Sequence, residues 1–121
     1  MKIGKPGLKE LDLVIAQNCS FSFSIIHKDD QGNIFDYSNA EIHMVLQPTN
    51  RQKRVYDFSD FCVGSDGNPN IVVTIPYAAT SSLPLGDIPW DLIVVNDGVA
   101  TRVAYGTATV VDTYALDGRL S

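Results

Sequence analysis

The chain has 121 residues, 45% of them hydrophobic and 19% charged, so it can form one domain with its own core. Nine Lys and Arg residues against fourteen Asp and Glu residues give a formal net charge of −5. An acidic surface repels nucleic-acid phosphates and anionic lipids, so we expect no nucleic-acid or membrane partner. Because Pro6, Gly7 and Lys9 stand where a signal peptide is apolar, we also expect a soluble protein without a secretory signal.

The N-terminal part predicts an extended arm followed by two strands. Residues 1–10 contain three lysines, two glycines and a proline, a composition typical of an arm without a core of its own. Apolar residues then alternate with other residues at positions 11–15. In residues 19–25, one cysteine, two phenylalanines and an isoleucine share one face and three serines share the other, which predicts a half-buried strand.

The middle of the chain predicts shorter strands separated by turns. Residues 28–33 read as a turn, because Gly32 and Asn33 tolerate a positive φ, and residues 40–47 alternate as a strand. A weaker pair of strands is expected at residues 55–58 and 61–63, before a turn rich in glycine and asparagine.

The last third carries the clearest signals. Residues 71–75 predict a strand, and residues 76–82 can form one helical turn that begins near Pro76. Apolar residues alternate from position 88 to 94, Asn96-Asp97-Gly98 is typical of a hairpin turn, and residues 99–111 predict the returning strand. Gly106 interrupts that strand and predicts a bulge or bend.

These elements predict an all-β fold, an antiparallel immunoglobulin-like β-sandwich of seven to nine short strands. A small closed barrel is the alternative. The expected organisation is an arm at residues 1–10, the sandwich at residues 11–112 and a tail at residues 113–121.

The sequence contains no pattern typical of an enzyme. It lacks a Gly-x-Ser-x-Gly elbow, a phosphate-binding glycine loop and a His-Glu-x-x-His motif, so we predict no catalytic residue, no metal ligand and no cofactor. The two histidines, His27 and His43, are expected to be solvated. Acidic stretches around Asp29 and Asp66 are interpreted as ordinary turns rather than calcium loops. Cys19 and Cys62 are expected to be separate thiols.

The candidate interaction residues are basic, with one aromatic. A basic run at residues 51–54 reads either as a solvated hairpin tip or as a cationic patch that docks an acidic partner surface. Trp90 shares the inward parity of its strand and is assigned to the core. The interaction set comprises three lysines of the arm, three cations of the run and one aromatic of the tail: Lys2, Lys5, Lys9, Arg51, Lys53, Arg54 and Tyr114.

The order of elements resembles a group of small tailed-bacteriophage virion proteins, and is similar to the immunoglobulin-like N-terminal domain of phage baseplate upper proteins. A Leu-Pro-x-Gly stretch ahead of an aromatic-Asp-Leu strand and an Asp-Gly hairpin carries most of the resemblance. Asn18, where the family more often has glycine, and Pro89 depart from it. The matching segments are residues 11–23, 28–33, 71–75, 83–86, 90–92, 97–98, 101–102 and 106–110.

The resemblance implies a non-enzymatic virion structural protein, assembled in the host cytoplasm, that adapts parts of the tail, baseplate or fibre-attachment region. Its partners would be other virion proteins, namely tail, baseplate, fibre or capsid subunits, and it would be oligomeric in the particle. A head decoration, or cement, protein on the capsid is the alternative. A carbohydrate- or ligand-binding β-sandwich module is a further alternative, which would need exposed aromatic residues.

Overall fold

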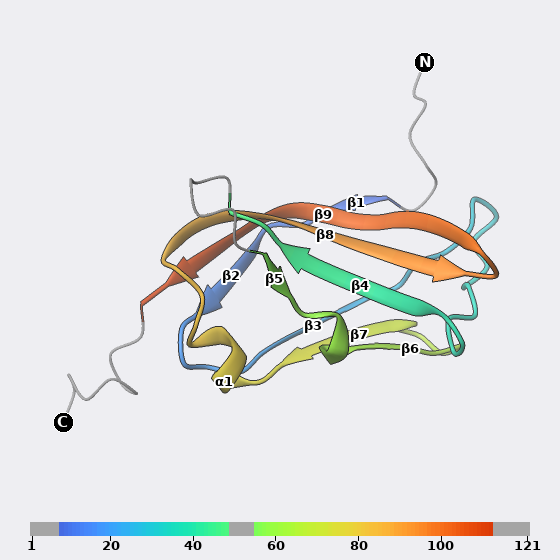
Figure 1. Ribbon diagram of the computed structural model, residues 1–121. Helices are drawn as coiled ribbons and strands as arrows, with labels where there is room; N and C mark the ends of the chain where they lie inside the picture. Colours follow the sequence, from blue (N-terminus) through green and yellow to red (C-terminus); the bar gives the residue numbers. More distant parts are fainter. Residues whose placement is uncertain (1–7, 49–54, 113–121) are drawn as a thin grey trace, which may run out of the picture.

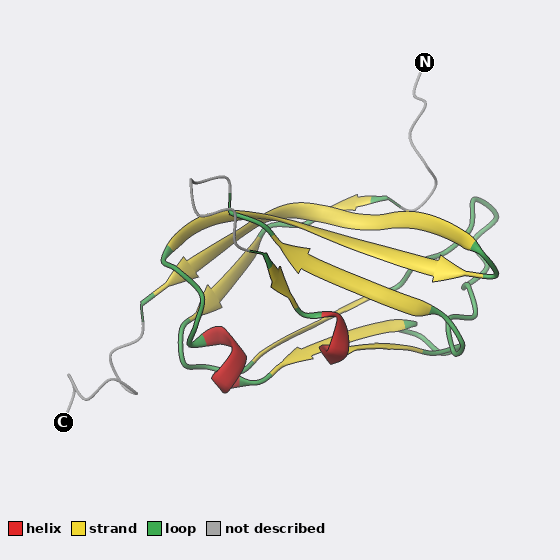
Figure 2. Cartoon of the chain, in the orientation of Figure 1, coloured by secondary structure: helices red, strands yellow, loops and turns green. Residues whose placement is uncertain are grey.

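The computed structural model describes residues 8–48 and 55–112, which form two β-sheets lying face to face (Figure 1). One sheet has six strands and the other has three. The single turn α1 (Tyr77–Thr80), directly after Pro76 as predicted, is the one α-helix in these residues, so the fold is mainly β (Figure 2). The two open sheets exclude the closed barrel. Within the described residues, no helix is long and apolar enough to cross a membrane.

The large sheet is built around its two longest strands, β8 (Gly86–Asn96) and β9 (Val99–Val111). They form the predicted hairpin, and its two-residue turn holds Asp97 at φ 53° and Gly98 at φ 77°. Both values are positive, as a turn of this kind requires. With 11 and 13 residues, neither strand is short. Buried residues alternate along β8, whereas in β9 the adjacent Val103 and Ala104 are both buried.

Two further strands extend the large sheet beyond β8. β4 (Glu41–Leu46) pairs antiparallel with β8, and β5 (Tyr56–Asp57) pairs antiparallel with the end of β4. β4 ends opposite Trp90, so Pro89 lies just past the last ladder pair, and its carbonyl accepts a hydrogen bond from the Gln47 backbone at 3.0 Å. A proline is tolerated there because a strand end needs no further ladder donor.

The first two strands of the chain pair with β9 in parallel. β1 (Lys9–Glu10) and β2 (Leu13–Ala16) run in the same direction as β9, with Lys9 opposite Ala104. The prediction of an antiparallel sandwich is therefore wrong for these two pairs, since alternation indicates a strand but not its direction. Two residues of the predicted arm, Lys9 and Glu10, belong to the sheet.

The small sheet contains β3 (Phe21–Ile25), β7 (Ile71–Ile75) and β6 (Cys62–Gly64), in the order β3-β7-β6 and antiparallel throughout. The alternation predicted for β3 is present, because Ser22 and Ser24 are exposed. The outward face of this sheet carries these serines and Thr74 beside the exposed Val63 and Val72, and its inward face contributes to the core.

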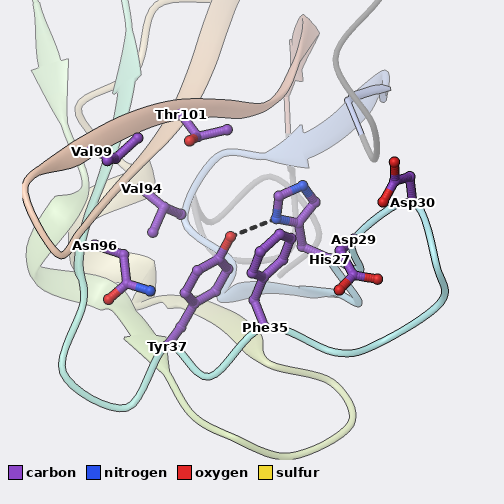
Figure 3. A pocket seen from close by; sticks show the side chains of 9 residues that line it. All are labelled: His27, Asp29, Asp30, Phe35, Tyr37, Val94, Asn96, Val99 and Thr101. Atoms are coloured by element: carbon purple, nitrogen blue, oxygen red, sulfur yellow. Dashed lines mark hydrogen bonds between the residues drawn. The ribbon is translucent and has the colours of Figure 1, made fainter.

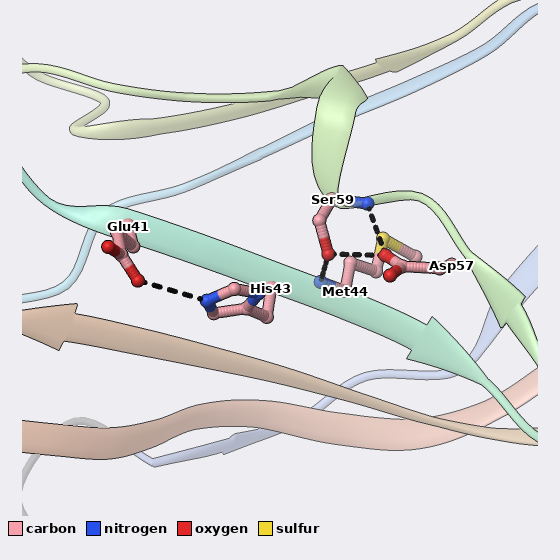
Figure 4. A network of polar contacts seen from close by, with 5 residues as sticks. All are labelled: Glu41, His43, Met44, Asp57 and Ser59. Carbon is pink, nitrogen blue, oxygen red and sulfur yellow. Dashed lines mark hydrogen bonds and ion pairs between the residues drawn. The ribbon is translucent and has the colours of Figure 1, made fainter.

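A short crossover carries the chain from the large sheet to the small one. The residues after β5 form a 3-10 turn, η1 (Ser59–Phe61), and Figure 4 shows how it is held: the Ser59 backbone N–H and hydroxyl donate to Asp57, and the Met44 N–H donates to the Ser59 hydroxyl at 3.2 Å. The two hydrogen bonds from Ser59, that of its hydroxyl first, lower the pKa of Asp57. The strands predicted at 55–58 and 61–63 thus exist but pair in different sheets, because this turn separates them.

Gly106 was predicted to mark a bulge or bend, and the structure places the bulge elsewhere. β9 continues through Gly106, and the register shift lies between Leu92 and Ile93 of β8, which pair with Ala104 and Arg102. Gly106 is required for another reason. A Cβ at this position would lie 2.0 Å from the Leu11 carbonyl oxygen, so the chain between β1 and β2 crosses directly over β9.

The core lies between the two sheets, and Trp90 belongs to it as predicted, with 2% of its surface exposed. Its indole N–H donates to the Leu11 carbonyl at 3.0 Å, so the buried polar atom has a partner. Inward residues of alternate strand positions fill the rest. The buried hydrophobic side chains include Leu13, Ile15, Ile25, Ile42, Met44, Leu46, Phe58, Ile71, Val73, Ile75, Leu83, Ile88, Leu92, Val94, Val103 and Val110.

Candidate functional site

The predicted interaction residues fall mostly outside the described part of the chain. Lys9 is described, and it is an exposed residue of β1. The other six, Lys2, Lys5, Arg51, Lys53, Arg54 and Tyr114, lie outside the described residues. The structure therefore does not test whether the predicted set forms one surface.

A pocket of about 420 Å³ lies at one end of the sandwich (Figure 3). The β3–β4 connection supplies one side of it, and the β8–β9 hairpin supplies the other. Aromatic and aliphatic side chains dominate its walls, with two carboxylates and one amide among them. The lining residues are His27, Asp29, Asp30, Phe35, Tyr37, Val94, Asn96, Val99 and Thr101.

Three stacked rings form one wall of the pocket. Each of the His27, Phe35 and Tyr37 rings contacts the other two, with centroid distances of 4.9 Å for His27–Phe35, 5.6 Å for Phe35–Tyr37 and 5.9 Å for His27–Tyr37. His27 Nδ1 and the Tyr37 hydroxyl are 2.6 Å apart and share a hydrogen bond. His27 is 2% exposed, so the prediction that it is solvated is wrong. It lies just past the end of β3, where the chain turns inward over the core rather than out into solvent.

Asn70 holds this wall in place from the small sheet. Its side-chain oxygen accepts from the His27 N–H at 2.8 Å, and its amide nitrogen donates to the carbonyls of His27 and Phe35 at 2.9 and 3.0 Å. Asn70 is fully buried, and all three of its contacts are with backbone groups, which need hydrogen-bond partners away from water. The residue directly before β7 therefore fixes the β3–β4 connection.

The acidic side of the pocket is an ordinary turn, as predicted. One Asp29 oxygen accepts the backbone N–H groups of Gln31 and Asn33, each at 2.9 Å. These bonds, that of Asn33 first, lower the pKa of Asp29. The neighbouring Asp30 is exposed. Among the described residues, no group of three or more metal-ligating side chains comes together.

Two groups of this site have shifted pKa values. Burial raises the pKa of Tyr37 to about 12, so its hydroxyl stays protonated at neutral pH and acts as a hydrogen-bonding group. Asp29 stays ionised and contributes negative charge. A hollow with aromatic walls and an anionic side suits a ligand group that is partly apolar and positively charged.

The remaining candidates behave largely as the sequence indicates. His43 is solvated on the outer face of β4, 3.5 Å from Glu41, as expected (Figure 4). Cys19 and Cys62 are not joined by a disulfide. Burial raises the pKa of the Cys62 thiol to about 12, which leaves it unreactive at neutral pH. Trp90 is buried, so it cannot provide the exposed aromatic surface that a sugar-binding module would need.

Sequence reasoning missed the pocket, although some of its signals were present. Phe35 and Tyr37 are alternate aromatics inside a segment otherwise rich in turn residues, a sign that the segment packs against the core. Nothing in the local sequence of Asn70 indicates contacts with residues more than thirty positions away. No protein-family model matches the chain, and no curated protein matches it significantly.

Proposed function

We propose that this chain is a non-enzymatic structural protein of a tailed-bacteriophage virion, built on an immunoglobulin-like sandwich and acting as an adaptor in the tail, baseplate or fibre-attachment region. The proposal starts from the ordered series of motifs that resembles baseplate upper proteins. Its partners would be neighbouring virion proteins, and contacts repeated by the symmetry of the particle would give tight attachment from modest single affinities.

The order of the strands is the observation that supports this proposal most. In an immunoglobulin domain, the second, fifth and fourth strands form one sheet with the first, while the third, sixth and seventh form the other. Here β3-β7-β6 makes up the small sheet and β9-β8-β4-β5 the main path of the large one. If β3 is taken as the second immunoglobulin strand, then β4, β6, β7, β8 and β9 correspond to the third to seventh strands. β5 is then an additional edge strand. The first strands differ, since β1 and β2 pair with β9.

The test is quantitative mass spectrometry of purified particles of the source phage, separated into head and tail fractions. We expect the chain in tails, at a few copies per particle. Hundreds of copies with the heads would instead favour the decoration protein of the capsid. Absence from both fractions would overturn the virion proposal and leave the ligand-binding module, with the pocket beside Tyr37 as its site.

A further inference from the structure

The connections between strands gather at two opposite ends of the sandwich, and their charges differ in sign. The β3–β4, β6–β7 and β8–β9 connections share the end that holds the pocket, because His27 bonds to Asn70 and the hairpin lines the same hollow (Figure 1). These connections contain one basic residue and five acidic ones. They are Lys28, Asp29, Asp30, Asp36, Asp66 and Asp97.

The connections at the other end contain no acidic residue. The β2–β3 and β7–β8 connections, residues 17–20 and 76–85, are uncharged. The β4–β5 connection carries Arg51, Lys53 and Arg54 in its sequence, and it joins the end of β4 to the start of β5, which pair with each other near the start of β8. Asp57, Asp87 and Asp112 are described acidic residues near this end, and they lie in or just after strands rather than in its connections. The connections at the pocket end are therefore acidic, whereas the sequence of the β4–β5 connection is basic.

The pocket provides a place for a basic side chain to insert. Val99, 63% exposed, and Phe35 offer apolar surface to an aliphatic stem, and the carboxylates of Asp29 and Asp30 lie on the same hollow. Arginine and lysine lay their stems along apolar surface while the charged group meets a carboxylate, and arginine also stacks on aromatic rings. The volume of about 420 Å³ is within the range of pockets that bind small ligands, which is ample for one side chain.

We propose that the pocket is a docking site for the basic run, residues 51–54, of a second copy of this chain. The described ends of β4 and β5 that the run connects lie away from the pocket, so each copy offers its basic run to one neighbour and its pocket to another. Such a head-to-tail contact is heterologous, and it closes into a ring or continues as a filament. This inference goes beyond the proposed function, since it concerns the purified chain and holds or fails regardless of its source particle.

The test is sedimentation velocity of the full chain over a range of concentrations and salt. We expect concentration-dependent assemblies that dissociate as salt screens the contact. Asp30→Lys reverses the charge of an exposed residue that lines the pocket, and Arg54→Glu reverses the charge of one residue of the run. Each should weaken association at least roughly tenfold, because like charges then face each other. Asp60→Lys, the same charge change at an exposed position of η1, is the matched control and should associate like the unmodified chain.

Mixing the two variants distinguishes a head-to-tail contact from other modes of association. D30K keeps an intact basic run and R54E keeps an intact pocket, so together they should form a one-to-one complex that cannot grow. The chain that carries both substitutions pairs opposite charges again and should recover longer assemblies. A monomeric unmodified chain at low salt, or D30K and D60K variants that associate alike, would overturn the proposal.

Discussion

Two buried polar contacts join distant parts of this chain, and they do so in different ways. At the pocket end, Asn70 holds the β3–β4 connection by three side-chain hydrogen bonds, and a hollow of about 420 Å³ remains beside that connection. At the junction of β1 and β2 with β9, Trp90 makes one bond to Leu11, and Gly106 lies so close that no Cβ would fit. A polar side chain can support a loop at a distance, whereas a glycine lets two backbones touch.

This difference predicts that the glycine junction is the less tolerant of the two. Gly106→Ala places a methyl group 2.0 Å from a backbone oxygen, so either β9 or the segment at Leu11 must move. We expect a loss of about 3 kcal/mol or more in the free energy of unfolding. Urea unfolding followed by the fluorescence of Trp90, the only tryptophan, measures it.

The control for this substitution is Gly98→Ala at the hairpin turn. Gly98 has a positive φ of 77° but no atom within 4 Å of a Cβ built there. It should cost only about 1–2 kcal/mol, the strain of alanine in the left-handed region. A G106A variant as stable as the G98A variant would show that the close approach at Leu11 has no energetic consequence.

Asn70 should come second, because its loss removes bonds without forcing atoms together. Asn70→Ala removes the hydrogen bonds that the His27 N–H and the Phe35 carbonyl make with this side chain and one of the two bonds to the His27 carbonyl, and we expect a loss of about 2–3 kcal/mol in the free energy of unfolding. Asn96→Ala at the same end removes one long, exposed bond to the Asp36 carbonyl and should cost about 0.5 kcal/mol or less. Equal losses in the two variants would contradict the role given to Asn70.

The sequence predicts strands better than it predicts these contacts. Alternation identified β3, β4, β7, β8 and β9, and Asn96-Asp97-Gly98 identified the hairpin, because both depend on neighbouring residues alone. The parallel pairing of β2 with β9 could not be predicted, since its partners lie about 95 positions apart. Asn18, one of the two positions that depart from the resemblance, adopts a φ of 64°, a conformation that asparagine tolerates.

The pocket could not be predicted for the same reason, because its contacts join residues that are distant in the sequence. A histidine at the end of a strand is usually solvated, and only the fold brings Tyr37 and Asn70 to His27. The prediction for Gly106 failed in a different way, because the residue was identified but the reason was wrong. Gly106 was correctly singled out as special, but its requirement comes from Leu11, a residue distant in sequence, and the extra residue at the register shift of β9 is Val103 instead.

Apart from the control substitutions, the smallest expected effect belongs to the Tyr37 hydroxyl, and it has a distinctive dependence on pH. Tyr37→Phe removes the 2.6 Å bond to His27 but keeps the stacked ring, so at neutral pH we expect a loss of about 1 kcal/mol in the free energy of unfolding. Burial raises the pKa of Tyr37 from 10.0 to about 12 in the folded chain. Above pH 10 the unfolded chain therefore releases this proton first, and ionisation favours unfolding.

The unmodified chain should consequently lose stability as the pH rises from 10 to about 12, whereas Y37F should lack this contribution. The other four tyrosines titrate in both proteins, so the difference between their unfolding free energies isolates Tyr37. Urea unfolding at several pH values in this window should show the Y37F deficit shrinking. A deficit that stays constant would mean that the hydroxyl is as accessible to water in the folded chain as in the unfolded one, and that the wall of the pocket at Tyr37 is open.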